Sequence, residues 1–188
     1  MKIVSVVALF SVLMLALASL AGAAPAQKLQ TFGTGKVAVT AADSATIVIE
    51  PGQYGGVYVN SKSQGGKTLD QVSFGFTSSG DVQGGAPRFS LPIDDPATAV
   101  KGDGYAFLDA AGCGAAVGDN VSDQKTRVST SDAACQVQYK DGSYANWAAF
   151  AEANPTLITT PGAIPFIIAD WTPENTTGTF IVSNIVLR

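Results

Sequence analysis

Acidic side chains are the residues in this sequence best suited to catalysis. Hydrolysis of a glycosidic bond needs two carboxyl groups, one of them kept protonated by an apolar setting. Asp170 is the strongest candidate, because it ends an apolar run and precedes Trp171. An aspartate before Thr172 and Pro173 is also typical of a turn, and we favour the turn. The other candidate carboxylates are Glu50, Asp109, Glu152 and Glu174.

A second group of acidic residues is a candidate metal site. Its members are close in the sequence: Asp94, Asp95, Asp103 and Asp109. Carboxylate oxygens suit Ca²⁺, but the spacing does not match an EF-hand loop. A solvated acidic loop is therefore the favoured interpretation. If calcium binds here we expect a structural role, and we predict no other cofactor.

The chain contains no histidine, which excludes several kinds of catalytic site. Neither a Ser-His-Asp triad, nor a Cys-His pair, nor a histidine-ligated zinc can be built. The formal net charge is -4, with 11 basic residues among 188. So acidic a chain is a poor partner for nucleic acid, whose binding depends on many basic side chains. We predict that the protein is not an enzyme and does not bind nucleic acid.

Two aromatic residues in turn-rich segments are candidates for contact with a sugar. Tyr54 lies between Gly52 and Gly55, and Trp171 follows Asp170. Sugar rings pack on flat aromatic side chains that have a few hydrogen-bonding neighbours. We therefore predict a ligand-binding set of Tyr54, Asp170 and Trp171. The alternative is that both rings fold back onto the core.

Three further features concern charge, oxidation and modification. For Arg88 we favour an internal ion pair over contact with an acidic ligand. Cys113 and Cys135 form an even pair, which in an oxidising compartment predicts a disulfide. Asn120 and Asn175 each begin an N-glycosylation sequon and are predicted to lie on exposed loops.

The first residues have the pattern of an export signal. Lys2 precedes an apolar run over residues 3–20, and Ala21 and Ala23 provide a small-residue cleavage site. A membrane anchor is the alternative, but no basic flank follows the run. We predict a signal peptide over residues 1–23 and one secreted, extracellular domain over residues 24–188, with no membrane contact after cleavage.

Alternation of apolar and polar residues dominates the remaining chain. Examples are residues 37–40, 46–50, 72–77, 89–93 and 179–187, separated by clusters of Gly, Pro, Asp and Ser. Many short strands without long helices indicate a sandwich or barrel. Pro92 within such a run indicates an edge strand or a bulge. One helix is expected over residues 144–153, capped by Ser143, with Trp147 and Phe150 buried. The predicted fold is all-β, a two-sheet β-sandwich of jelly-roll type with one short helix.

Several segments resemble those of uncharacterised small secreted proteins, fungal-type and some bacterial. They are GGVYV (55–59), GGAPRF (84–89), DGYAFLD (103–109), YANW (144–147), PFIIAD (165–170) and GTFIVSNIVL (178–187). This resemblance covers most of the chain after the signal and implies no catalytic residue. The last segment is also similar to the closing strand of galactose-binding-like jelly rolls, the scaffold of many carbohydrate-binding modules. Ser183 stands where aspartate is common in that strand.

These observations favour a secreted, non-catalytic module that binds extracellular or cell-wall glycan. One alternative is a structural or surface-interaction protein that binds no sugar. The other is a carboxylate-based glycoside hydrolase, which predicts turnover that is lost in Asp170→Asn.

Overall fold

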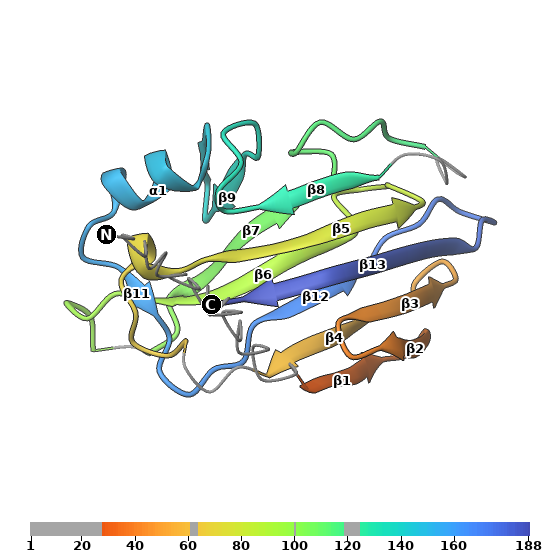
Figure 1. The fold of residues 1–188 in the computed structure, drawn as a ribbon, viewed down its shortest axis with the longest axis horizontal. Helices are drawn as coiled ribbons and strands as arrows, with labels where there is room; N and C mark the ends of the chain where they lie inside the picture. The colour runs from red at the N-terminus through yellow and green to blue at the C-terminus, as the bar shows by residue number, and fades with distance from the viewer. Residues whose placement is uncertain (1–27, 61–63, 100, 119–124) are drawn as a thin grey trace, which may run out of the picture.

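The computed structural model describes residues 28–60, 64–99, 101–118 and 125–188, which form two antiparallel β-sheets packed face to face (Figure 1). The predicted two-sheet β-sandwich with one short helix is confirmed. The predicted signal peptide and Asn120 lie outside the described residues. Within the described ranges, no helix has the length and apolar composition that crossing a membrane requires.

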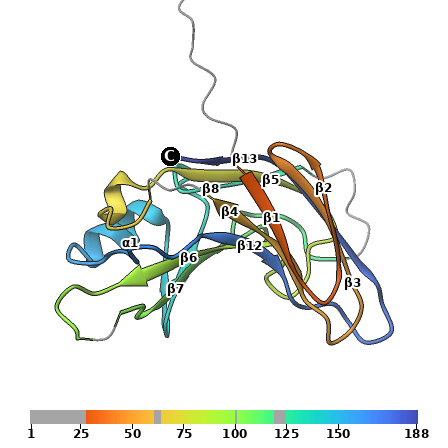
Figure 2. The ribbon, with the colours of Figure 1, turned by 90° about the horizontal axis from the view of Figure 1, so that it is seen from below.

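The two sheets differ in size and form separate layers (Figure 2). The eight-stranded sheet has the order β1 (Lys28–Gly33), β4 (Gly55–Asn60), β12 (Phe166–Ala169), β6 (Arg88–Asp94), β7 (Gly104–Asp109), β9 (Val137–Tyr139) and β10 (Gly142–Tyr144), with β11 (Ile158–Thr159) paired to β6. The five-stranded sheet has the order β2 (Lys36–Ala41), β3 (Ser44–Ile49), β13 (Gly178–Leu187), β5 (Phe74–Gly80) and β8 (Thr126–Ser129).

The core lies between the sheets and is built by alternation along the strands. Successive side chains of a strand point to opposite faces, so every second residue enters the core. Inward-facing residues that are fully buried include Ile47, Ile49, Val57, Val59, Phe76, Phe89, Leu91, Ile93, Leu108, Ile167, Phe180 and Val182. Burying each large apolar side chain contributes roughly 1.5–3 kcal/mol, which holds the two layers together.

The interpretation of Pro92 was wrong. Its strand β6 is central, because β12 pairs with one side of it and β7 with the other. The carbonyl of Pro92 accepts a hydrogen bond from the Thr160 amide at 3.0 Å, while the last β12 partner of β6 is at Ser90. The missing N–H of Pro92 faces Thr160 beyond the end of β12, so this pair makes one hydrogen bond in place of two and β6 stays paired on both sides of the proline.

The helix α1 (Trp147–Ala153) is shorter than expected and starts later. Asn146, not Ser143, caps it, since the Asn146 side chain accepts a hydrogen bond from the Ala149 amide at 2.9 Å. Trp147 and Phe150 are buried, as predicted. The Trp147 indole Nε1 donates to the carbonyl of Leu69 at 2.8 Å, which ties α1 to the 3₁₀ turn η1 (Leu69–Gln71).

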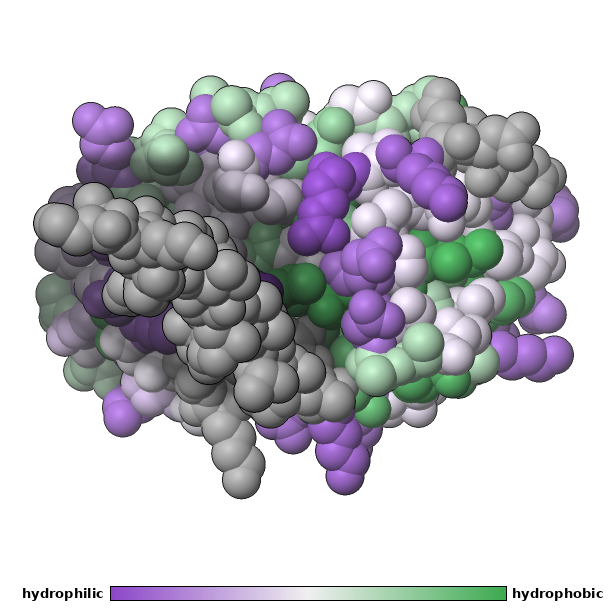
Figure 3. All heavy atoms as spheres, viewed as in Figure 1, coloured by the Kyte–Doolittle hydropathy of each residue, from purple (hydrophilic) through white to green (hydrophobic). Residues whose placement is uncertain are grey.

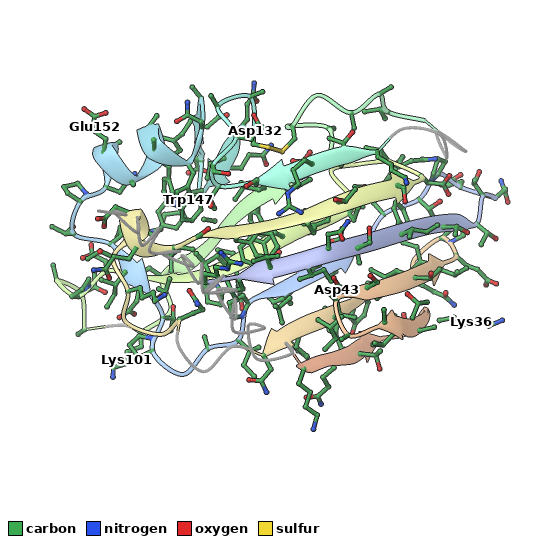
Figure 4. All side chains as sticks on the ribbon, viewed as in Figure 1. Lys36, Asp43, Lys101, Asp132, Trp147 and Glu152 are labelled. Atoms are coloured by element: carbon green, nitrogen blue, oxygen red, sulfur yellow. A yellow bond between two sulfur atoms is a disulfide. The ribbon has the colours of Figure 1, made fainter. Side chains whose placement is uncertain are left out.

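The predicted disulfide between Cys113 and Cys135 is confirmed. Its sulfur atoms are 2.05 Å apart, and the two residues are 22 positions apart in the chain. The bond is drawn in yellow near Asp132 in Figure 4. It joins the segment after β7 to the segment before β9, next to the edge strand β8, where the Ser129 amide donates to Cys135 Sγ at 3.5 Å.

Candidate functional site

The three predicted ligand-binding residues lie at one end of the eight-stranded sheet. Strands β12 and β4 run antiparallel with Ala169 opposite Gly55. Continuing this register by one residue places the backbone of Asp170 beside that of Tyr54. The Tyr54 carbonyl accepts hydrogen bonds from the amides of Thr34 and Gly35 at 2.8 and 2.9 Å, which fixes its backbone. The Tyr54 side chain is 45% exposed, so it is not folded into the core.

Trp171 rests on a turn that has no side chain at the point of contact. A Cβ atom added to Gly84 would lie 2.6 Å from Cδ2 and Cε3 of the Trp171 indole. Gly84 also has a φ of +54°, a conformation that favours glycine. The indole is therefore held against the backbone of the turn while remaining 49% exposed. Any side chain at position 84 would displace the ring.

Asp170 is paired with Arg88, as predicted for that arginine. Strand β12 places Ile168 opposite Arg88 on β6, and Asp170 Oδ2 accepts a hydrogen bond from Arg88 Nη2. The two side chains are 25% and 27% exposed, so solvent reaches only part of the pair. The Arg88 guanidinium also lies 5.1 Å from the centre of the Phe107 ring, within the range of a cation–π contact.

The outer side of the eight-stranded sheet carries a continuous group of rings, which we call the aromatic face. Its members are Phe32, Tyr58, Tyr105, Phe107 and Phe166. The ring centres are 4.5 Å apart for Phe32 and Tyr58, 5.6 Å for Phe32 and Phe166, 5.5 Å for Tyr105 and Phe166, and 6.1 Å for Tyr105 and Phe107. The rings come from β1, β4, β12 and β7. These strands are adjacent in the sheet, except that β6 lies between β12 and β7.

The strand register explains why these rings gather. Tyr58 is opposite Phe166, Phe166 is opposite Ser90, and Ser90 is opposite Phe107. Because paired residues share a face, one row of side chains crosses four strands on the side away from the core. In Figure 2 the eight-stranded sheet arches, and its outer face lies on the inner side of that curve.

Polar atoms lie among the rings and lack protein partners. Ser90 Oγ, Arg88 Nε and Asp170 Oδ1 are buried and have no hydrogen bond within the described part of the chain. Buried polar groups in proteins are normally hydrogen-bonded to protein or water. These three atoms are shielded from solvent, so the polar groups that the aromatic face presents to a ligand are the exposed parts of Arg88 and Asp170.

Analysis of the sequence missed the aromatic face. The signal was present in the outward phase of three strands, where Tyr58, Tyr105, Phe107 and Phe166 stand at positions that are usually polar in a half-exposed strand. Each of these rings has a fully buried apolar neighbour in the chain, such as Val57 or Ile167. Because the residues on both faces of these strands are apolar, the sequence does not indicate which face of each strand points to the core.

The four candidate calcium ligands do not form one group. Asp109 is at the opposite end of β7 from Asp103, roughly 20 Å away for a strand of this length. Asp103 Oδ2 accepts hydrogen bonds from the Asp95 amide and Thr98 Oγ1, at 2.7 and 3.2 Å, and Asp94 Oδ1 accepts from the Gly102 amide at 2.8 Å. The described residues contain no group of three or more His, Cys, Asp or Glu side chains placed to hold a metal ion. Structural calcium stays a prediction.

The remaining candidate residues are dispersed. Glu50 after β3, Glu152 in α1 and Glu174 in the turn before β13 are all exposed. Asp109 is opposite Arg88 in the sheet, and its Oδ1 accepts a hydrogen bond from the Gly112 amide at 2.7 Å. Asn175 is exposed in the loop between Asp170 and β13, where a sugar could be attached, and its glycosylation stays a prediction.

Comparison with known proteins identifies no relative: no family model matches the chain, and no curated protein or solved structure is significantly similar to it.

Proposed function

We propose that the protein is a secreted, non-catalytic module that binds an extracellular or cell-wall glycan through the aromatic face. The observation that carries this proposal is the row of rings on the outer side of the eight-stranded sheet, with the Arg88–Asp170 pair beside it. A sugar presents apolar C–H surfaces to rings and hydroxyl groups to polar neighbours, and this face offers both kinds of partner.

The most exposed ring of the aromatic face is the one that we expect a sugar to contact first. Tyr105 is 44% exposed and lies between Phe166 and Phe107. A sugar packed on Tyr105 would have the Arg88 guanidinium close by, since Arg88 lies over Phe107. At the end of the sheet, Tyr54 and Trp171 are exposed on either side of the Asp170 backbone and would offer further ring surfaces. The surface therefore suits a chain of several sugars better than a single sugar.

Binding is a better use of these residues than hydrolysis. Asp170 Oδ2 is engaged by Arg88, and Asp109 Oδ1 by the Gly112 amide. A hydrolase needs one carboxyl that donates a proton and a second that attacks or activates water. Two carboxylates already bonded to donors are poorly suited to these roles. Turnover of any glycan that is lost in Asp170→Asn would favour the hydrolase instead.

Retention on insoluble polysaccharides tests the proposal. The chain offers a matched pair of variants, because Ile181 is exposed to a similar extent on the outer side of the other sheet. We expect Tyr105→Ala to weaken binding about tenfold, the effect of losing roughly 1.4 kcal/mol of stacking. Ile181→Ala should bind as the wild type does. Failure of the wild-type protein to bind any of a broad panel of glycans contradicts the proposal.

A structural, surface-interaction role is the alternative. The same apolar face could pack against a second copy, and the exposed Ile164 just before β12 adds to it. This role predicts concentration-dependent self-association in analytical ultracentrifugation, reduced in Tyr105→Ala and unaffected by soluble sugars. Competition by an oligosaccharide would instead support glycan binding at this face.

A further inference from the structure

A pocket of about 590 Å³ lies between α1 and η1, and none of its lining residues belongs to the aromatic face. Its walls come from η1 and Val72, from the turn after β8, and from α1 with the residues that follow it. Figures 1 and 2 both show α1 and η1 side by side at the end of the sandwich where β6 finishes. The volume falls within the range of sites that bind small organic molecules.

The surface of the pocket is mainly apolar. Its apolar lining residues are Leu69, Val72, Trp147, Ala148, Ala151 and Pro155. The polar groups of the wall are largely bonded to protein: Trp147 Nε1 to the Leu69 carbonyl, Thr130 Oγ1 to the Phe74 carbonyl at 3.3 Å, and Asn154 Nδ2 to the Phe150 carbonyl at 2.9 Å. A ligand therefore gains more from apolar contact than from hydrogen bonds to the wall.

The charge of the pocket has one sign. Asp70 on η1 and Glu152 on α1 belong to the lining, and no basic residue does among the described residues. Neither carboxylate has an ion-pair partner there, since the described ranges contain a single salt bridge, between Arg88 and Asp170. The last turn of α1 also has no basic residue to offset its carbonyl groups. In Figure 4, Glu152 is at the outer side of α1 and Trp147 is beneath the helix, toward the strands.

We propose that this pocket binds a small organic cation with an apolar body, such as an alkyl or aryl ammonium compound. The apolar body would occupy the space beside Trp147. The charged group would lie toward Asp70 and Glu152. An apolar carboxylate of the same size should bind more weakly, because the pocket lining contains two carboxylates and, among the described residues, no basic side chain. This site is separate from the aromatic face and does not depend on the glycan proposal.

Titration with three probes that share an eight-carbon chain tests the proposal: octyltrimethylammonium and octanoate below their micelle concentrations, and 1-octanol below its solubility limit. The chain has two tryptophans, so Trp171→Phe leaves Trp147 as the only tryptophan fluorophore. We expect a saturable change in Trp147 emission with octyltrimethylammonium, weaker binding of octanol and none of octanoate. Asp70→Asn and Glu152→Gln should each weaken the binding of the ammonium probe about threefold, while Glu174→Gln, outside the pocket, should not.

A matched pair of substitutions on α1 locates the binding. Ala148 lines the pocket, whereas Ala153 is on the same helix, is exposed and does not. Ala148→Leu should weaken binding of octyltrimethylammonium about tenfold by filling the space, and Ala153→Leu should leave it unchanged. Circular dichroism checks that both variants fold. Equal effects of the two substitutions, octanoate binding as tight as that of the ammonium probe, or no saturable change overturns the proposal.

Discussion

The outer faces of the two sheets differ in the residues that they present to solvent. The five-stranded sheet carries short polar side chains there, seen mainly in purple and pale colours around small green patches in Figure 3. Among them are Thr46, Thr77, Ser79 and Thr179, with Arg127 at the edge strand β8. The eight-stranded sheet carries the five rings of the aromatic face in the equivalent phase of its strands.

This difference between the outer faces indicates that the outward aromatic residues are not needed for the fold. Both sheets fill the core with their inward residues, so both are stabilised by the same interior. The outer face of the five-stranded sheet has no ring among its described residues, so a sheet of this sandwich can pack without outward aromatic side chains. Rings on the outer side of the other sheet therefore point to contact with another molecule, the basis of the function that we propose.

The largest expected effect compares an inward and an outward phenylalanine on paired strands. Phe89 is fully buried and stacks on Phe74, whereas Phe166, opposite the next residue of β6, is only partly buried. We expect Phe89→Ala to lower the free energy of unfolding by about 3–5 kcal/mol, through lost burial and a cavity. Phe166→Ala should cost less than about 2 kcal/mol. Urea unfolding measures both, and equal losses would show that the aromatic face belongs to the folding core.

The disulfide gives the next largest effect. Replacing Cys113 and Cys135 together by serine should lower the free energy of unfolding by about 3 kcal/mol, because the unfolded chain loses the constraint of a closed loop. Glycan binding should persist under conditions where the variant is folded, since neither cysteine belongs to the aromatic face. A reducing agent should destabilise the wild-type protein and leave the double variant unchanged in thermal unfolding. An equal response of both proteins would contradict this.

The two arginines of the outer faces provide a smaller, more selective comparison. Arg88→Met leaves the partly buried Asp170 without its ion-pair partner, and we expect a cost of about 1–2 kcal/mol. Arg127 is exposed and its Nη1 donates to the Asn184 carbonyl at 3.0 Å, so Arg127→Met should cost less than about 1 kcal/mol. In urea unfolding, Arg88→Met with Asp170→Asn should be more stable than Arg88→Met alone. If the double variant is less stable than Arg88→Met alone, the unpaired charge of Asp170 is not the cause of the loss in Arg88→Met.

The smallest effect concerns a buried tyrosine on the inner side of the eight-stranded sheet. Burial raises the pKa of Tyr139, which outweighs the opposing influence of Lys140. Above about pH 10 the unfolded chain therefore loses this proton first, and the free energy of unfolding falls as the pH rises. Tyr139→Phe should reduce that fall by less than about 1.4 kcal/mol per pH unit. Unfolding in urea between pH 9 and 11 measures it, with Tyr105→Phe as the exposed control. An unchanged slope in Tyr139→Phe would contradict the assignment.

Much of the fold was predictable from the sequence because a strand's periodicity is a local property. Alternation in residues 46–50 and 72–77 corresponds to β3 and β5, and the stripe of Trp147 and Phe150 marked the helix. The helix start was wrong because both Ser143 and Asn146 are good caps, and pairing of residues 142–144 with β9 decided between them. That pairing is a tertiary contact, which local pattern does not contain.

The site was predictable only in part. Tyr54, Asp170 and Trp171 were chosen for their residue types, yet their shared location follows from the pairing of β12 with β4. Phe166 and the buried Ile167 are consecutive apolar residues, so the sequence alone did not indicate which of them points away from the core. The position of the second sheet determines that. Asp109 lies apart from the other three candidate calcium ligands, because the length of β7 separates residues that are close in sequence.

Strands β1 and β2 follow each other in the chain but lie in different sheets, joined by residues 34–35 alone. At this margin a short stretch of main chain prevents the layers from separating. At the opposite margin the main chain between β8 and β9 also joins the sheets, and the bond between Cys113 and Cys135 adds a second link, from the segment after β7. Reduction would therefore remove a link at this margin alone, so that amide hydrogen exchange should accelerate in β8 and β9 before it does in β2 and β3.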